Sequence, residues 1–491
     1  MKKHHFLFAV ILILTFIFRL PSLFEPFWYG DEGIFAAVGR NLNLGGVLYE
    51  NSWDNKPPMI YLTYQLIFKF FGVSMFWLHL VAAVVVLATA AVIYEIAQGI
   101  LGTKRALFAA FIFGLLTSLR LLEGNLALTE IFMILPISLA MLFAIKRNFD
   151  YKSLFLAGFL FAIASLYKQV GALEAAALGI FVFLGEKNFL TFIKKGAVLS
   201  FGFAIPYVVT VAYFAPKNLV DDYIFAAYTY YRIYFEESPK YAVLVNISKF
   251  LPVVATVFYG AYKKFKTKDV SVFHLILLWS AFSFLGSYFS GRTYGHYLVQ
   301  ATPAVSLLAA SISQKIKFGR ARVIFAICFL VPLLFLTRLL FSDFLSGGPI
   351  NQVKYFRNFI DFALGAKSLN SYNDFFDGNV NTIMALSDAL KSRGAFGKSV
   401  YIWGDYPWLY AIVDAKNPSR YVTSFHVFGV PEGKEEVVDD INKSLPEYII
   451  KPESSIGYFA QLEKILSSRY TLEAKVETAQ LYRLRKIDGQ L

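Results

Sequence analysis

Residues 76–99, which read FWLHLVAAVVVLATAAVIYEIAQG, decide the fold of this chain. The stretch is almost wholly apolar and is followed closely by the basic pair Lys104-Arg105. A helix needs about 20 predominantly apolar residues to cross the hydrocarbon core of a bilayer, so this stretch predicts a transmembrane helix. Similar apolar runs recur between short basic segments and predict eleven spans, near residues 6–20, 76–99, 106–122, 131–145, 153–168, 171–185, 197–214, 250–262, 271–289, 301–313 and 323–341.

The composition of the 491 residues agrees with a polytopic membrane protein. Hydrophobic residues make up 57% and charged residues only 16%, whereas a soluble globular protein carries about 25% charged residues. Aromatic residues make up 18%, which is too much apolar area for a disordered chain. The single cysteine, Cys328, excludes an intrachain disulfide and a cysteine-based zinc site, and we interpret it as a packing residue.

The net charge of +13 is unevenly distributed, and its location predicts the topology. Residues 344–491 contain 17 basic and 17 acidic residues, so the whole excess lies in residues 1–343. There, 18 basic and 3 acidic residues fall in the segments 1–5, 103–105, 146–152, 185–196, 262–270 and 314–322. This clustering follows the positive-inside rule and predicts a cytoplasmic N-terminus in a multi-pass cell-membrane protein. A nucleic-acid partner is excluded, because it would require a basic face on a soluble fold.

Two of the predicted helices are unusually short. Residues 153–185 carry basic residues on both flanks, so they must cross the membrane an even number of times. We therefore predict two helices that turn at Lys168-Gln169. The first apolar run, residues 6–20, is followed by Arg19, Leu20 and Pro21 rather than by small residues, so we interpret it as an uncleaved helix and not as a secretory signal.

The chain is expected to contain two domains, a multi-pass membrane domain of residues 1–343 and a soluble extracytoplasmic α/β domain of residues 344–491. In the second, β-like runs alternate with helix-like stretches. The runs lie at 398–403, 420–424, 447–451, 470–476 and 480–485, and the helix-like stretches at 380–393, 433–444 and 457–468. Within the membrane domain, residues 32–43 and 59–71 have the periodicity of amphipathic helices that lie on the outer interface.

Acidic candidates for catalysis occur at the outer ends of predicted spans. Asp31-Glu32 follows Trp28-Tyr29-Gly30. The plain structural interpretation makes Asp31 the N-cap of a helix that starts at Glu32, and the functional one makes it an acceptor of a hydroxyl proton near the headgroup layer. Glu130 is followed immediately by apolar residues, and an ionisable group at membrane depth is a functional candidate by default.

Basic candidates occur at the same ends. Lys56 precedes Pro57-Pro58, which suit a helix start. The two prolines fix the lysine, whose point charge suits a phosphate. Lys168 either snorkels to the interface or contacts phosphate. Arg292 and His296 share a short outer loop, although a lone histidine is more often a packing residue than a ligand. No histidine and carboxylate have firm metal spacing, so we predict no structural metal and leave a divalent cation open.

As an ordered set these motifs resemble a known family. Asp31-Glu32, Lys56-Pro57-Pro58, Glu130, Tyr167-Lys168-Gln169 and Gly291-Arg292 with His296-Tyr297 and Pro303 are similar to polyprenyl-phosphate-dependent glycosyltransferases of the GT-C fold, in particular the protein O-mannosyltransferase and lipid A aminoarabinose transferase group. The resemblance implies inverting transfer of a sugar from a lipid-phosphate donor at the outer membrane face. It implies that Asp31 is the acceptor-side base and Lys56 a phosphate ligand. Glu130 stands where the family commonly has Asp.

From these observations we expect catalytic roles for Asp31, Glu32 and Glu130. A cationic wall for the donor phosphate is expected from Lys56, Lys168, Arg292 and His296, because all of them fall at outer helix ends. The alternative is a transporter or lipid flippase, which would show repeat symmetry and charges near the midplane, and neither is found in the sequence. An inactive membrane scaffold stays open. The sequence assigns neither the sugar nor the acceptor.

Overall fold

The structure is a computed structural model that describes residues 2–236, 242–266, 270–290, 292, 294–312, 351–453 and 457–485. The chain divides into two compact units, each built from separate segments. The first, which we call the helical unit, comprises Met1–Leu23, His79–Lys217 and Phe235–Tyr355. The second, the mixed unit, comprises Phe24–Leu78, Asn218–Tyr234 and Phe356–Leu491.

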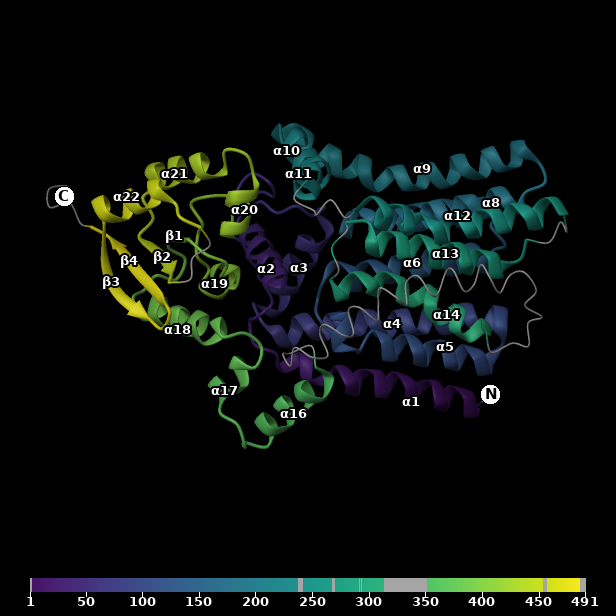
Figure 1. Ribbon diagram of the computed structural model, residues 1–491, viewed down its shortest axis with the longest axis horizontal. Coiled ribbons are helices and arrows are strands. Elements are labelled where there is room, and N and C mark those ends of the chain that lie inside the picture. The colour runs from purple at the N-terminus through teal and green to yellow at the C-terminus, as the bar shows by residue number, and fades with distance from the viewer. Residues whose placement is uncertain are drawn as a thin grey trace. The chain divides into compact units, whose positions relative to one another are not determined.

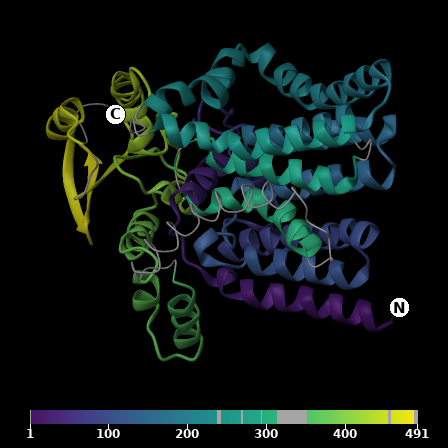
Figure 2. The same ribbon diagram turned by 45° about the vertical axis from the view of Figure 1, so that its right-hand side comes forward.

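The helical unit consists of long apolar helices that lie side by side, as two views show (Figure 1, Figure 2). They are α1 (Lys2–Arg19), α4 (Met75–Leu101, which begins in the mixed unit), α5 (Thr103–Leu116), α6 (Thr129–Lys146), α7 (Tyr151–Tyr167), α8 (Leu173–Gly185), α9 (Phe189–Phe214), α12 (Ala242–Lys266), α13 (Val272–Tyr288) and α14 (Thr302–Ile312). Every predicted span up to residue 313 overlaps one of these helices, although the span at 106–122 runs past the end of α5 at Leu116. The last predicted span, 323–341, and Cys328 lie outside the described residues, so the number of crossings stays a prediction.

Among the described residues, four helical stretches are long and apolar enough to cross a membrane: Lys3–Phe24, Met75–Leu101, Thr129–Lys146 and Phe189–Lys217. Tyr151–Tyr167, Gln169–Gly185 and Val272–Tyr288 are apolar but shorter. The expected turn between two short helices is confirmed: α7 ends at Tyr167, Lys168 is extended with φ −153° and ψ 130°, and a 3-10 turn (η3, Gln169–Ala172) leads into α8.

Glycines let two of these helices approach closely. A Cβ at Gly158 of α7 would collide with the carbonyl oxygen of Leu199 on α9, and one at Gly202 of α9 would collide with that of Phe155 on α7. Small residues at facing positions are the usual device for close packing between membrane helices, because lipid tails supply no hydrophobic drive for association.

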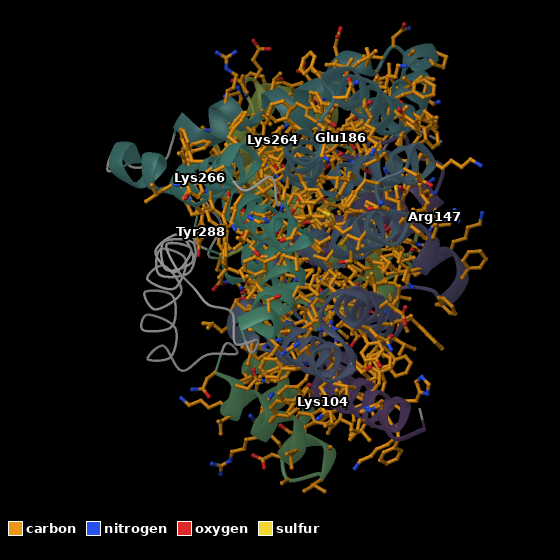
Figure 3. The ribbon with its side chains drawn as sticks, turned by 90° about the vertical axis from the view of Figure 1, so that its right-hand side faces the viewer. Lys104, Arg147, Glu186, Lys264, Lys266 and Tyr288 are labelled. Carbon is orange, nitrogen blue, oxygen red and sulfur yellow. The ribbon has the colours of Figure 1, made fainter. Side chains whose placement is uncertain are left out.

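Basic residues gather where consecutive helices of the unit join. Lys104, Arg147 and Lys264 lie at such junctions, and Figure 3 looks onto this end of the helices. Some of these cations are paired, as Lys146 is with Glu95 at 2.7 Å and Lys195 with Glu186 at 2.6 Å. The grouping agrees with the pattern from which the cytoplasmic side was predicted.

The mixed unit combines residues 24–78, the first outer loop of the predicted topology, with the C-terminal sheet. Its helices are α2 (Gly30–Asn43), α3 (Met59–Phe71), α10 (Val220–Ile224), α17 (Leu369–Asp374), α18 (Asn379–Ser392), α19 (Pro407–Ile412), α20 (Ser424–Gly429), α21 (Gly433–Ser444) and α22 (Ala460–Arg469), while α11 (Tyr231–Glu236) and α16 (Gln352–Ala363) each span the boundary between the units. The strands are β1 (Val400–Ile402), β2 (Tyr448–Pro452), β3 (Tyr470–Val476) and β4 (Ala479–Leu484).

The sheet has the strand order β1-β2-β4-β3, with β1 and β2 parallel and the other pairs antiparallel. Its core contains Ile402, Ile450 and Leu481 from the strands, Leu386 from α18 and also Ala37 from α2. The first outer loop is therefore part of the core of the α/β fold. The expected helices at 32–43 and 59–71 and the alternation of strands and helices after residue 379 are confirmed.

One expected strand is wrong. In the run 420–424, Tyr421 forms only an isolated bridge with Trp53, and Thr423 caps α20 by accepting the N–H of His426 at 3.4 Å. The chain therefore turns into a helix at Ser424 instead of extending along the sheet. The expected domain boundary at residues 343 and 344 lies outside the described residues and stays a prediction.

Candidate functional site

The acidic pair of the first outer loop begins α2. The helix starts two residues earlier than expected: Tyr29 is the N-cap residue, and its carbonyl accepts the N–H of Gly33 at 3.0 Å. Asp31 is therefore not the N-cap, and α2 has no side-chain cap. The expectation was wrong because the backbone bond to Tyr29 places both acids inside the first turn, where they still complement the helix dipole.

The two acids differ in exposure. Asp31 is half-buried, whereas Glu32 is fully buried with 0% exposure. Next to Glu32, a Cβ at Gly33 would lie 2.8 Å from the ring of Trp408 on α19, so α2 packs tightly there. Burial and then the charges of Glu32 and Asp31 raise the pKa of Tyr64 on α3 well above its usual value. Only Asp31 of the pair is accessible to a substrate.

Lys56 lies in a turn that is held from both sides, which we call the Lys56 turn (residues 49–58). The hydroxyl of Tyr49 donates to the Lys56 carbonyl at 2.8 Å, and the Lys56 N–H donates to the hydroxyl of Tyr61 at 3.2 Å. The Lys56 ammonium donates to the side-chain oxygen of Asn55 at 2.7 Å. The two prolines that follow are buried and lead into α3, as the sequence predicted. The backbone of Lys56 is thus fixed while its side chain is only half-buried.

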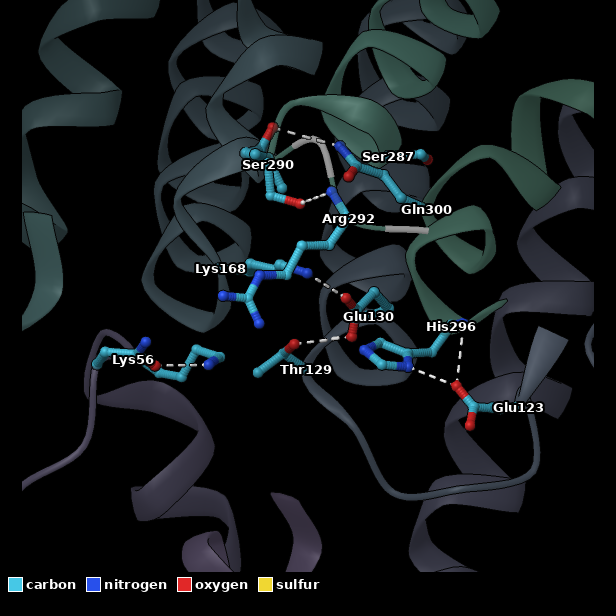
Figure 4. A network of polar contacts seen from close by, with 12 residues as sticks. Lys56, Glu123, Thr129, Glu130, Lys168, Ser287, Ser290, Arg292, His296 and Gln300 are labelled. Atoms are coloured by element: carbon cyan, nitrogen blue, oxygen red, sulfur yellow. Dashed lines mark hydrogen bonds and ion pairs between the residues drawn. The ribbon is translucent and has the colours of Figure 1, made fainter. Parts of the chain in front are cut away.

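In the helical unit, Glu130 and Lys168 form a buried ion pair (Figure 4). Glu130 lies in the first turn of α6 with 1% exposure, and it also accepts the hydroxyl of Thr129 at 2.8 Å. The Lys168 ammonium lies 3.5 Å from the centre of the Tyr297 ring. Lys168 therefore points into the protein and does not snorkel to the interface.

His296 and Glu123 form a second buried pair beside the first (Figure 4). The Nδ1 atom of His296 lies 2.6 Å from a carboxylate oxygen of Glu123. Burial opposes the charge on His296, but the negative charges of Glu130 and then Glu123 raise its pKa above the usual value. Burial likewise opposes ionisation of Glu123, yet the His296 contact and the charge of Arg120 hold the pKa of Glu123 below its usual value. Both shifts favour the charged pair, an imidazolium with a carboxylate.

Arg292 adds a third cation to this part of the helical unit. Its backbone N–H donates to the hydroxyl of Ser290 at 3.3 Å, and Figure 4 shows its guanidinium on the same side of the network as Lys168. The structure thus places Glu130, Lys168, Arg292 and His296 in the helical unit and groups them there. Asp31, Glu32 and Lys56 belong to the mixed unit.

Sequence reasoning missed Glu174 of α8. Its side chain is fully buried, and one carboxylate oxygen accepts from Gln300 at 2.8 Å and from the hydroxyl of Ser283 at 2.9 Å. Gln300 also donates to the Val170 carbonyl at 3.3 Å, which ties the turn after Lys168 to the turn that carries His296. The missed signal was a carboxylate within an apolar run, the same rule that selected Glu130.

In the described part of the chain, no group of three or more His, Cys, Asp or Glu residues could hold a metal ion. Asp54 of the Lys56 turn is buried and contacts Tyr61 and His426, and neither Asp54 nor His426 was singled out from the sequence.

Comparison with known proteins identifies the fold. Residues 55–214 match the family described as dolichyl-phosphate-mannose-protein mannosyltransferase. ArnT from Cupriavidus metallidurans, crystallised in the apo state, superimposes with a TM-score of 0.59 over 98% of both chains at 14% sequence identity. The fold is that of the GT-C glycosyltransferases. The resemblance inferred from the sequence motifs is thereby confirmed.

A second ArnT structure and one sequence relative also match this chain. The structure of the same ArnT bound to undecaprenyl phosphate gives a TM-score of 0.57 over 97% of both chains at 14% identity. An uncharacterised protein from Aquifex aeolicus (strain VF5) is 24% identical over 337 residues, a match that spans 65% of this chain and 65% of that protein. The matched family segment contains Lys56, Glu130 and Lys168, but not Asp31, Arg292 or His296.

Proposed function

We propose that this protein transfers a sugar from a polyprenyl-phosphate-linked donor to an acceptor at the outer face of the membrane, with inversion at the anomeric carbon. The observation that carries the proposal is the buried network of Lys168, His296 and Glu130 at helix ends of a GT-C fold. Buried cations near the headgroup layer are costly unless they are paired or functional. A structural relative bound to undecaprenyl phosphate supports a lipid phosphate as their ligand.

In the proposed reaction the acceptor hydroxyl attacks the anomeric carbon of the donor. Asp31 takes the hydroxyl proton, the new carbon–oxygen bond forms, and the bond to the phosphate oxygen breaks with its electron pair. The lipid phosphate leaves with a growing negative charge, which Lys56, Lys168, Arg292 and His296 stabilise. A single displacement of this kind inverts the anomeric configuration.

The carboxylates have different parts in this scheme. Glu130 neutralises Lys168 when no donor is bound, which makes a buried ammonium tolerable. The complete burial of Glu32 favours a supporting role beside Asp31 over contact with substrate. No step of the scheme uses a metal, and a divalent cation on the donor phosphate stays open.

The proposed topology places the N-terminus in the cytoplasm and the C-terminal sheet outside. Residues 24–78 and 356–491 share one compact unit, so the chain must cross the membrane an even number of times between them. The segment from 79 to 217 contains α4 to α9, and the segment from 235 to 355 contains α12, α13, α14 and the expected span at 323–341. Both counts are even.

The test is donor consumption by purified protein in lipid nanodiscs. With a radiolabelled polyprenyl-phosphate sugar and an envelope extract as acceptor source, the label should move from the lipid to a product, and undecaprenyl phosphate should compete. A flippase would move the labelled lipid across sealed vesicles and leave it intact. A scaffold would do neither, and either of these two results would overturn the proposal.

A further inference from the structure

The C-terminal part of the chain reaches the Lys56 turn within the mixed unit. The Trp53 N–H donates to the Arg420 carbonyl at 2.8 Å, and the guanidinium of Arg420 donates to the Tyr49 carbonyl at 3.4 Å. Arg420 also donates to Asp222 at 3.1 Å and to Glu436 at 3.0 Å. These contacts dock the C-terminal part on the loop, and they are made around residues 49 and 53 rather than at Lys56 itself.

A different contact leads to Lys56. The Nε2 atom of His426 on α20 lies 3.3 Å from a carboxylate oxygen of Asp54, and both side chains are 3% exposed. The other ring nitrogen of His426 is buried without a hydrogen-bond partner in the described part of the chain. A buried polar group costs free energy when it is left unsatisfied, so a histidine is unfavourable here if its role is only to fill space. Its edge-on contact with Trp53, at 5.0 Å between ring centres, could be made equally well by phenylalanine.

From Asp54 the connection continues to the Lys56 backbone. The second carboxylate oxygen of Asp54 accepts the hydroxyl of Tyr61 at 2.6 Å, and the same hydroxyl oxygen accepts the Lys56 N–H at 3.2 Å. Tyr61 is fully buried and Asp54 nearly so, so these partners cannot exchange for water. His426, Asp54 and Tyr61 therefore form an unbroken buried series that ends at the backbone of Lys56, and we call it the His426 relay.

Electrostatics support the same connection. Burial alone would raise the pKa of Asp54, but the charge of Lys56 and the contacts of His426 and Tyr61 hold it well below its usual value. Asp54 is therefore ionised at all ordinary pH values, and its charge acts directly on Lys56. His426 therefore contacts a permanent charge within the Lys56 turn.

We propose that the C-terminal part of this protein belongs to the donor site, because His426 positions Lys56 through Asp54 and Tyr61. This inference rests on the proposed function, in which Lys56 binds the donor phosphate. His426 is a positioning residue here, since it acts on Lys56 through two other side chains. The α/β part is accordingly required for affinity toward the lipid phosphate and does more than dock on the outer loop.

The experiment measures the affinity of the full-length protein for undecaprenyl phosphate in detergent, together with thermal unfolding. His426→Phe keeps a ring against Trp53 and removes the nitrogen, and we expect Kd to rise about ten-fold, the effect of one charge-assisted hydrogen bond. His426→Gln returns an amide near the Nε2 position and should restore most of the affinity. Tyr61→Phe breaks the relay at its other end and should weaken binding by a similar factor.

The matched control is Arg420→Gln, which removes side-chain contacts to Tyr49, Asp222 and Glu436 but leaves the relay intact. It should lower thermal stability and leave the Kd within about two-fold, since docking alone is affected. If Arg420→Gln and His426→Phe weaken binding equally, any loosening of the contact between the C-terminal part and the Lys56 turn lowers the affinity. That result would refute the relay. Lys56→Ala distinguishes a failure of the relay from a failure of the proposed role of Lys56. If Lys56→Ala weakens binding but the relay variants do not, the relay is wrong; if Lys56→Ala has no effect, the assignment of Lys56 itself fails.

Discussion

At the residue scale, the acidic pair of α2 shows how burial divides two neighbouring carboxylates. Asp31 is half-buried and makes no capping hydrogen bond, and Glu32 is fully buried. A general base must reach the acceptor hydroxyl, so exposure selects Asp31. The family resemblance already implied Asp31 as the base, and the burial of Glu32 supports the same choice.

Asp31→Asn should lower sugar transfer by at least about two orders of magnitude, because a positioned general base contributes about 10²–10⁴-fold. Stability should change little, since asparagine keeps the size of the side chain and no cap bond is lost. Glu32→Gln should mainly lower the thermal midpoint. Initial rates with labelled donor, beside unfolding curves, measure both. If Glu32→Gln abolishes transfer while Asp31→Asn does not, the base is Glu32, and if neither matters the catalytic interpretation of this loop is wrong.

The buried pair of Lys168 and Glu130 predicts a stability effect that is not additive. Lys168→Met leaves an unpaired buried carboxylate and should cost about 3–5 kcal/mol of unfolding free energy. Adding Glu130→Gln should recover most of that stability, because the uncompensated charge is gone. Affinity for undecaprenyl phosphate should stay low in the double variant, since the cation is still missing. Full recovery of binding in the double variant would show that Lys168 has a structural role only.

The pair of His296 and Glu123 predicts a pH dependence with a definite sign. The folded-state pKa of His296 is raised above its unfolded value of about 6.5. Its contribution to stability is therefore fully present below about pH 6.5 and is lost as the pH rises through the folded-state pKa. The difference in thermal midpoint between the wild type and His296→Gln should be larger at pH 6 than at pH 9. A difference that is constant over this range would mean that His296 is neutral.

At the element scale, the contact between α7 and α9 depends on Gly158 and Gly202. Gly158→Ala places a methyl group against the Leu199 carbonyl and should destabilise the helix pair by about 1–3 kcal/mol, the usual cost of overpacking. Gly179→Ala on α8 is the matched control, because its Cβ would meet nothing closer than 3.9 Å. Thermal unfolding in detergent compares the two. Equal midpoints would show that α7 and α9 can separate without cost.

Helices were predicted correctly from the sequence where a long apolar run defines them. The prediction failed where a contact with another part of the chain determines the structure. The apolar runs and the turn at Lys168 were readable, because hydrophobic length and basic flanks act within each segment. The run 420–424 has the residues of a strand, but Tyr421 forms only an isolated bridge with Trp53 and Thr423 caps α20. Pairing partners were equally hidden, since Lys168 meets Glu130 from a separate helix and His426 meets Asp54 from the far end of the chain.

At the scale of the whole molecule, the proposed topology can be tested independently of catalysis. A phosphatase reporter that is active only outside the cytoplasm, fused after Leu491, should be active, and the same reporter fused in the turn after Lys146 should be silent. The reason is the excess of basic residues at the junctions of α4 with α5, α6 with α7 and α8 with α9. Activity at the second site alone would invert the proposed orientation and place the site on the cytoplasmic face.

The mixed unit also sets an order for biosynthesis. α2 contributes Ala37 to a core whose other buried members are encoded after residue 379, and β4, which pairs with both β2 and β3, spans Ala479–Leu484. At a synthesis rate of roughly 5–20 residues per second, those strands are made about 20–90 seconds after α2. On the proposed topology, the exported loop has no core to join during that interval. We expect a holding chaperone or the translocation machinery to cover α2 until the sheet is made.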